Sequence, residues 1–117
     1  MVEIRTKLNP NIFYFALKQN RLIDKLNKAF DNRIRLGIMS VLMVNEDVNF
    51  NFLKEMLTIT DGNLASHLKP LEEQKYIKIT KGFLGKKTNT TYSITKIGEK
   101  AFREHIAALE EMLKGIS

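Results

Sequence analysis

The spacing of hydrophobic residues changes abruptly after residue 76. From residue 61 onward leucines recur at helical intervals, which predicts a helix with one apolar face. In residues 77–80, and again in residues 90–95, apolar and polar residues alternate, which predicts two half-buried strands. The basic segment between them, residues 81–89, contains two glycines and is predicted to be the loop of a β-hairpin. A helix that leads into a basic hairpin is therefore the centre of the expected fold.

Pro70 lies inside the helix predicted at residues 61–77. A proline there costs about 3 kcal/mol, because it removes a backbone hydrogen bond and crowds the preceding turn. The leucines face inward and Pro70 faces outward, so we expect a bent or tightened helix near residues 66–70 rather than two separate elements. Two interpretations stay open: the bend aims Asn63 and Ser66 at a partner, or Pro70 only begins the final turn.

Helical periodicity also occurs on both sides of this region. Asp31 is expected to cap a helix, as is Thr60 or Asp61. Thr95 is expected to cap the last helix, with Glu99 near enough to assist. The remaining expected elements are one long helix or two abutting helices at 10–30, a helix at 36–44 that is buried nearly all round, an extended stretch at 48–50, a short helix at 52–57 and a last helix at 96–116.

Length and composition restrict the class of protein. A chain of 117 residues fits one domain, so we expect residues 1–117 to form a single, mainly α domain with a small β-hairpin. The absence of cysteine excludes a disulfide scaffold and thiolate metal sites. No apolar run is long enough to span a membrane, so a cytoplasmic protein is expected. No group of acid, base or nucleophilic residues converges, and we therefore expect no enzyme, metal or cofactor.

The positive charge is concentrated in two parts of the chain. Residues 1–35 hold eight Lys/Arg against three acidic residues, and a second basic segment follows the predicted second helix. The formal net charge is +6, and residues 75–87 contain a run of lysines without an acidic residue. A basic strip on a small domain favours a polyanionic partner. The alternative is a lysine surface that only keeps the protein soluble.

The order of the expected elements is helix, helix, turn, helix, hairpin, helix. A short helix, a tight turn and a second helix form a helix-turn-helix, whose second helix can lie in a major groove. The segments DNRIRLGIMSVL, FNFLKEMLTITDGNLASHLKPLEEQKYIKI and GKKTNTTYSITKIGEKAF resemble the winged-helix regulators of the MarR and ArsR superfamily. The resemblance covers roughly residues 31 to 103 in the same order, with the basic hairpin in the place of the wing.

This resemblance implies a transcription regulator that binds double-stranded DNA as a homodimer, with its terminal helices forming the dimer. Metal-sensing members use cysteine or clustered histidine, whereas this chain has only His67 and His105, so we do not expect metal sensing. A pocket between the region of Phe13 and Phe15 and the terminal helix could hold a small apolar effector, as in some relatives.

The candidate DNA contacts fall into two groups. On the second helix, an asparagine can pair with adenine through two hydrogen bonds and a lysine can donate to guanine. Asn63 could instead cap the helix, and His67 could instead be satisfied at the edge of the core. Arg33 and Arg35 could contact the backbone or only solvate a helix start. The base candidates are Asn63, Ser66, His67 and Lys69, and the phosphate and wing candidates are Lys81, Lys86, Lys87, Thr88 and Asn89.

The last helix carries a narrow apolar seam, stepping by four and three residues, whose spacing is typical of a helix–helix contact. The N-terminal helix adds aromatic side chains that either join an interface or pack on the chain itself. The dimer-interface candidates are Phe13, Phe102, Ile106, Leu109 and Leu113.

Two other functions stay open. The same fold could be a protein–protein interaction module without specific DNA binding, in which the lysines are only solvated. A binder of single-stranded nucleic acid would need exposed aromatic rings on which bases stack, whereas Tyr76 and Tyr92 are expected to belong to the hairpin.

Overall fold

The computed structural model describes residues 23–114. Contacts divide the chain into two compact units. One consists of residues 27–103, and of the other the structure describes residues 23–26 and 104–114. The expectation of one domain over residues 1–117 stays a prediction. Phe13, Phe15 and the rest of the N-terminal helix predicted before residue 23 lie outside the described residues, as do residues 115–117.

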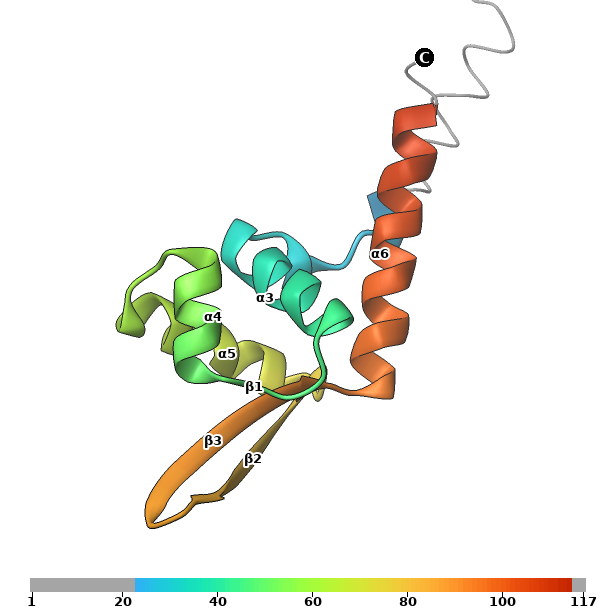
Figure 1. Ribbon diagram of the computed structural model, residues 1–117. Coiled ribbons are helices and arrows are strands. Elements are labelled where there is room, and N and C mark those ends of the chain that lie inside the picture. Colours follow the sequence, from blue (N-terminus) through green and yellow to red (C-terminus); the bar gives the residue numbers. More distant parts are fainter. Residues whose placement is uncertain (1–22, 115–117) are drawn as a thin grey trace, which may run out of the picture. The chain divides into compact units, whose positions relative to one another are not determined.

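From residue 31 onward the elements follow the predicted order, and the fold is the expected combination of helices with a small antiparallel sheet (Figure 1). The helix predicted to reach residue 30 ends at residue 25, and residues 28–30 form a separate 3-10 helix. Val48 and Asn49 pair with Tyr92 and Thr91, so the extended stretch before the short helix adds a third strand to the hairpin. The strand order is β1-β3-β2. The elements are η1 (Lys28–Phe30), α3 (Arg33–Val44), β1 (Val48–Asn49), α4 (Phe50–Leu57), α5 (Asp61–Glu73), β2 (Ile77–Leu84), β3 (Lys87–Ile94) and α6 (Lys96–Lys114).

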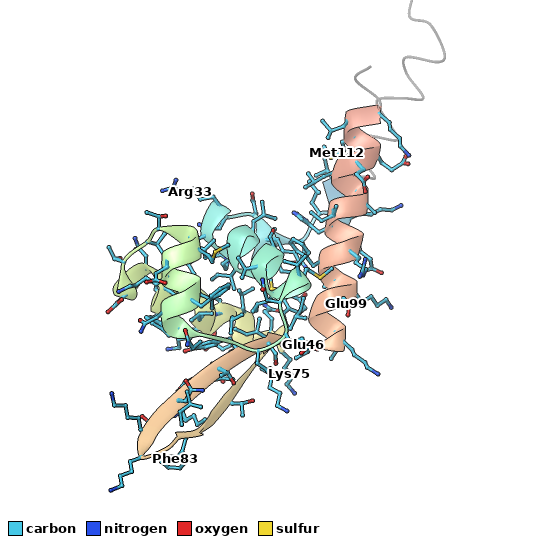
Figure 2. All side chains as sticks on the ribbon, in the orientation of Figure 1. Arg33, Glu46, Lys75, Phe83, Glu99 and Met112 are labelled. Carbon is cyan, nitrogen blue, oxygen red and sulfur yellow. The ribbon has the colours of Figure 1, made fainter. Side chains whose placement is uncertain are left out.

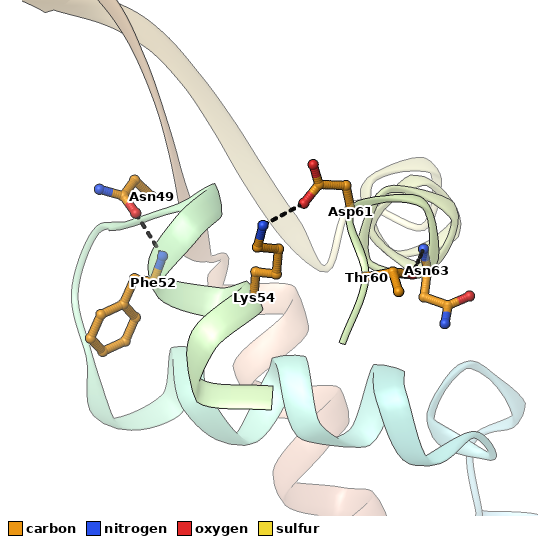
Figure 3. Close-up of polar contacts among 6 residues, drawn as sticks. All are labelled: Asn49, Phe52, Lys54, Thr60, Asp61 and Asn63. Carbon is orange, nitrogen blue, oxygen red and sulfur yellow. Dashed lines mark hydrogen bonds and ion pairs between the residues drawn. The ribbon is translucent and has the colours of Figure 1, made fainter. Parts of the chain in front are cut away.

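Polar side chains cap the N-termini of α3, α4 and α5. Asn32 caps α3 by accepting hydrogen bonds from two backbone N–H groups, so the prediction that Asp31 is the cap is wrong by one position. Asn49 caps α4 by accepting from the N–H of Phe52 at 2.8 Å (Figure 3). Thr60 caps α5, as predicted.

Thr95 fixes the junction between the hairpin and α6. Its hydroxyl accepts from the N–H of Gly98 at 2.9 Å and donates to the carbonyl of Lys75 at 2.7 Å, which confirms the predicted cap. The carboxylate of Glu99 accepts from Arg103 instead, so Glu99 contributes an ion pair within α6. Gly98 is required here, because a Cβ atom at this position would overlap the carbonyl oxygen of Tyr76.

The core of the first unit forms where α3 packs on η1, α4, α5 and β3. α3 is not buried nearly all round, because these neighbours cover only part of its surface. Ser40 is exposed on the uncovered part, and Val44 at its end is 81 % exposed. Among the residues 23–114, no helix is both long and apolar enough to cross a membrane. The largest fully buried side chains are Phe30, Ile38, Met39, Leu42, Leu53, Leu64 and Leu71.

The hairpin strands are longer than predicted. Lys81 pairs with Thr90 and Phe83 with Thr88, so most of the predicted loop at residues 81–89 belongs to the strands. The turn consists only of Gly85 and Lys86, and Gly85 has a φ of 65°, which suits a two-residue hairpin turn. The threonines of β3 favour extended backbone, and this preference outweighs the glycine at residue 82.

Candidate nucleic-acid interface

The outer face of α5 carries the candidates for base contact. Leu64, Leu68 and Leu71 are buried, whereas Asn63, Ser66 and Lys69 are exposed on the opposite side, as the helical spacing predicts. The helix is continuous through Pro70, which confirms one element rather than two. A bend at the proline stays a prediction.

Asn63 has a side-chain amide that is available for a partner. Its backbone N–H donates to the hydroxyl of Thr60 at 3.2 Å, so Thr60 rather than Asn63 caps the helix. The amide group points away from the helix (Figure 3) and makes no hydrogen bond with any residue in the range 23–114. A free amide in this position can donate to and accept from one adenine edge.

Ser66 is less available than Asn63. Its hydroxyl donates to the carbonyl of Asn63 at 3.0 Å, which uses its only proton inside the helix. The hydroxyl oxygen keeps its lone pairs, so in this rotamer Ser66 can accept a hydrogen bond from a base amine but cannot donate one.

His67 is half-buried and joined to α3. The Nη1 of Arg35 lies 3.0 Å from the Nδ1 of His67, and the Nε of Arg35 donates to the carbonyl of Ala29 at 2.7 Å. A guanidinium group only donates, so Nδ1 accepts and Nε2 carries the proton of the neutral ring. Burial, and then the positive charge of Arg35, lower the pKa of His67 below its ordinary value. The arrangement favours the core-edge interpretation of His67 and gives Arg35 a partner within the domain.

The turn between α4 and α5 has an ion pair across it. The Nζ of Lys54 lies 2.9 Å from a carboxylate oxygen of Asp61, which joins the two helices of the helix-turn-helix (Figure 3). Thr58 ends α4 in the left-handed region with a φ of 52°. Sequence reasoning missed this pair, because only the geometry of the turn brings the two residues together. The pair is partly exposed and stabilises the turn by at most about 1 kcal/mol.

The charges of α5 and of the hairpin are opposite in sign. α5 contains Asp61, Glu72 and Glu73 against the single base Lys69, a formal charge of 1 − 3 = −2. Residues 75–94 contain five lysines and no acidic residue. The positive potential of this region therefore comes from the hairpin, and α5 alone would not attract a polyanion.

The hairpin register divides the predicted wing residues among three positions. Residues opposite each other on an antiparallel pair share a face, so Lys81 and Thr88 lie on the face that continues from the buried start of β2. Lys87 and Asn89 lie on the other face, and Lys86 lies in the turn. All except the half-buried Asn89 are exposed. The hairpin is basic on both faces and at its tip.

A sequence model of the winged helix DNA-binding domain matches residues 34–113, a span that contains the helix-turn-helix and the hairpin. The chain belongs to the winged helix DNA-binding domain family. In this family the β2–β3 hairpin is the wing and α5 is the second helix of the helix-turn-helix. The predicted resemblance to winged-helix regulators is thereby confirmed.

One protein similar in sequence and two solved structures with this fold illustrate what the chain resembles. An uncharacterized protein of Methanocaldococcus jannaschii, MJ0432, is 37 % identical over 89 residues, which are 76 % of this chain and 97 % of that protein. The structure of a transcriptional regulator homologue from Pyrococcus horikoshii matches with a TM-score of 0.75 at 26 % identity, over 84 % of this chain and 95 % of that one. A PadR family transcriptional regulator from Eggerthella lenta shares the fold, with a TM-score of 0.58 at 24 % identity over 68 % and 76 % of the two chains. Both solved structures are of proteins in the transcriptional-regulator class.

The predicted seam of α6 is only partly available for a partner. Phe102 is 5 % exposed, and its ring packs edge-on against Phe30 at 5.3 Å between centroids, so it belongs to the core of the winged-helix unit. In the second unit Ile106 and Leu109 are half-buried, and Leu113 is 64 % exposed. These three side chains remain candidates for a dimer contact. Within the described part of the chain, no cluster of three potential metal ligands occurs.

Proposed function

We propose that this winged-helix protein is a sequence-specific regulator of transcription that binds double-stranded DNA. In this proposal α5 lies in the major groove and the β2–β3 wing contacts the phosphates. The main support for this proposal is the free amide of Asn63 on the outer face of α5, on a DNA-binding domain whose adjacent wing holds four lysines and no acidic residue.

The opposite charges of α5 and the wing suggest that the two elements contribute differently to DNA binding. The wing lysines supply most of the electrostatic attraction, which depends on salt and not on sequence. Asn63 and Lys69, with Ser66 as an acceptor, read the bases, while the ion pair between Lys54 and Asp61 reduces the repulsion between the start of α5 and the phosphates. His67 has the smaller role in this proposal, because its Nδ1 is bonded to Arg35 and only the Nε2–H of the neutral ring is left for a base or a phosphate.

We further propose that the protein acts in the cytoplasm as a homodimer, held by Phe13 and by the α6 residues Ile106, Leu109 and Leu113. Two-fold symmetry then presents two copies of α5 to half-sites about one helical turn apart, or a multiple of it. We also propose that the protein binds a small apolar effector. A structural neighbour of this fold, NadR, was solved in complex with 4-hydroxyphenylacetate.

The second candidate function is a protein–protein interaction module without specific DNA binding. The acidic character of α5 favours it, because a helix with a formal charge of −2 is an unusual surface to place against DNA.

Selection of genomic fragments with the purified protein distinguishes the two functions. The regulator should enrich a few fragments that share a symmetric sequence, and footprinting should protect two half-sites on one face of the duplex. Fragments recovered without a common sequence at any salt concentration would contradict specific DNA binding and support the interaction module.

A further inference from the structure

The tip of the wing presents two large apolar side chains to solvent. Phe83 is 73 % exposed and Leu84 is 68 % exposed, and they are the last two residues of β2 before the turn. Phe83 lies at the far end of the hairpin, away from the helices of the same unit (Figure 2). Adjacent bare apolar side chains of this size on a small domain indicate a contact surface.

The fold itself does not require these side chains. The apolar residues at the start of β2, Ile77 and Ile79, pack towards the core, whereas Phe83 and Leu84 oppose the exposed Thr88 and Lys87. Gly85 alone satisfies the left-handed backbone of the turn. Polar residues at positions 83 and 84 would therefore leave the hairpin hydrogen bonds and the core unchanged.

The surroundings of the tip specify the chemistry of the partner. Lys81 lies two residues before Phe83 on the same face, and Lys87 is the cross-strand partner of Leu84 on the other face. Each apolar side chain thus has a lysine on its own face, and Lys86 completes the tip. A suitable partner has anionic walls on both sides and, between them, flat apolar faces that a side chain can enter. The minor groove of duplex DNA, about 6 Å wide, has phosphates along both walls, and the faces of a partly unstacked base step are apolar.

We propose that Phe83 and Leu84 enter the minor groove next to the α5 site as an apolar wedge, which partly unstacks a base step and bends the duplex. Lys81 and Lys87 meet the phosphates on the two walls of the groove. Apolar wedges of this type kink DNA in other architectures. A second copy of this chain is a poorer occupant, because its own wing is equally basic. This inference rests on the DNA-binding function proposed above and adds a bend to it.

The test uses the full chain and a duplex of about 30 base pairs selected by the wild-type protein, a length that holds two half-sites. Fluorophores at the two ends report the bend by energy transfer, and titrations at several salt concentrations report affinity. Phe83→Ala and Leu84→Ala should each weaken binding about tenfold and reduce the bend at saturation, because a stacked aromatic or inserted aliphatic group is lost. The slope of log affinity against log salt should not change. Val44→Ala, at the most exposed apolar side chain of α3, is the control and should change neither quantity.

The possible results separate the wedge from the function on which it rests. If the wild-type protein selects no duplex, the DNA-binding function fails and the wedge fails with it. If the wild-type protein selects a duplex but Phe83→Ala and Leu84→Ala bind and bend it like wild type, the wedge is refuted and DNA binding stands. If the two variants lose binding to anionic phospholipid vesicles, or lose dimer mass, while the bend is unchanged, the tip serves a membrane or a second copy and the wedge is refuted.

Discussion

Removing the charge at the tip of the wing should weaken DNA binding without changing which sequence is preferred. Lys86 and Lys87 are both exposed at the turn of the hairpin, and replacing both with alanine removes two phosphate contacts per half-site. Each contact releases nearly one counterion, so the slope of log affinity against log salt should become shallower by about two per half-site. At about 0.15 M salt the same relation gives a loss of affinity of roughly 30-fold per half-site.

Fluorescence anisotropy of a labelled duplex, measured over a range of salt concentrations, gives both quantities. The matched control is the double variant Lys28→Ala with Lys100→Ala, which removes the same charge from exposed positions on η1 and α6. Thermal melting should show that the wing variant is folded, because substitutions at exposed turn positions change stability by about 0.5 kcal/mol or less. Equal slopes for wild type, wing variant and control would refute the role of the wing. A slope that falls equally in both variants would mean that net charge, not the wing, drives binding.

Three further outcomes follow from the geometry of the fold. In chemical denaturation, Gly98→Ala should destabilise the protein by about 2 kcal/mol or more, because the new Cβ would overlap the Tyr76 carbonyl. Gly62 has open space around it, so Gly62→Ala should stabilise α5 by about 0.5 kcal/mol. Equal effects of the two substitutions would contradict the close contact at Gly98. Folding lowers the pKa of His67, so below pH 6.5 the unfolded chain binds more protons than the folded one. The melting temperature should therefore fall as the pH drops through this value, and it should fall less in His67→Gln. Parallel curves of melting temperature against pH for the two proteins would refute this role of His67. At micromolar concentration, light scattering should give the mass of a dimer for wild type and of a monomer for Leu113→Lys. A monomer mass for wild type would contradict the proposed homodimer.

The sequence predicts the outer face of α5 correctly because helical spacing alone decides it. Three leucines at helical intervals determine which side is buried, and Asn63, Ser66 and Lys69 then face outward whatever the rest of the chain does. The cap at Thr60 is equally local, since a hydroxyl and a backbone N–H three residues apart make it.

Contacts between elements could not be predicted in the same way. Arg35 and His67 are 32 residues apart, and only the packing of α3 on α5 brings them to 3.0 Å. The sequence alone therefore does not decide between a base contact and the core edge for His67. The role of Phe102 depends on Phe30, which lies in a short 3-10 helix far away in the sequence.

The sequence predicts strands that are shorter than those of the wing for a different reason. Two glycines within nine residues are typical of a loop, but the cross-strand hydrogen bonds and the threonines of β3 keep residues 81–84 and 87–89 in the ladder. The signal that the strands continue was present in Thr88 and Thr90, which alternate with Lys87 and Asn89.

We propose that α5 reads base sequence, and a selection from randomised duplexes with wild type and Asn63→Ala examines this reading through one side chain. Wild type should enrich a two-fold symmetric site with half-sites about one helical turn apart, or a multiple of it. Asn63→Ala should lose the base preference at one or two positions in each half-site. The preferred base there should be adenine, because an amide can pair with it through two hydrogen bonds. The loss should weaken binding to the preferred site by about 1–3 kcal/mol. The salt slope and melting temperature of the variant should stay near those of wild type, because Thr60 caps the helix. If the folded variant enriches the same site with undiminished preference, α5 does not read the bases through Asn63.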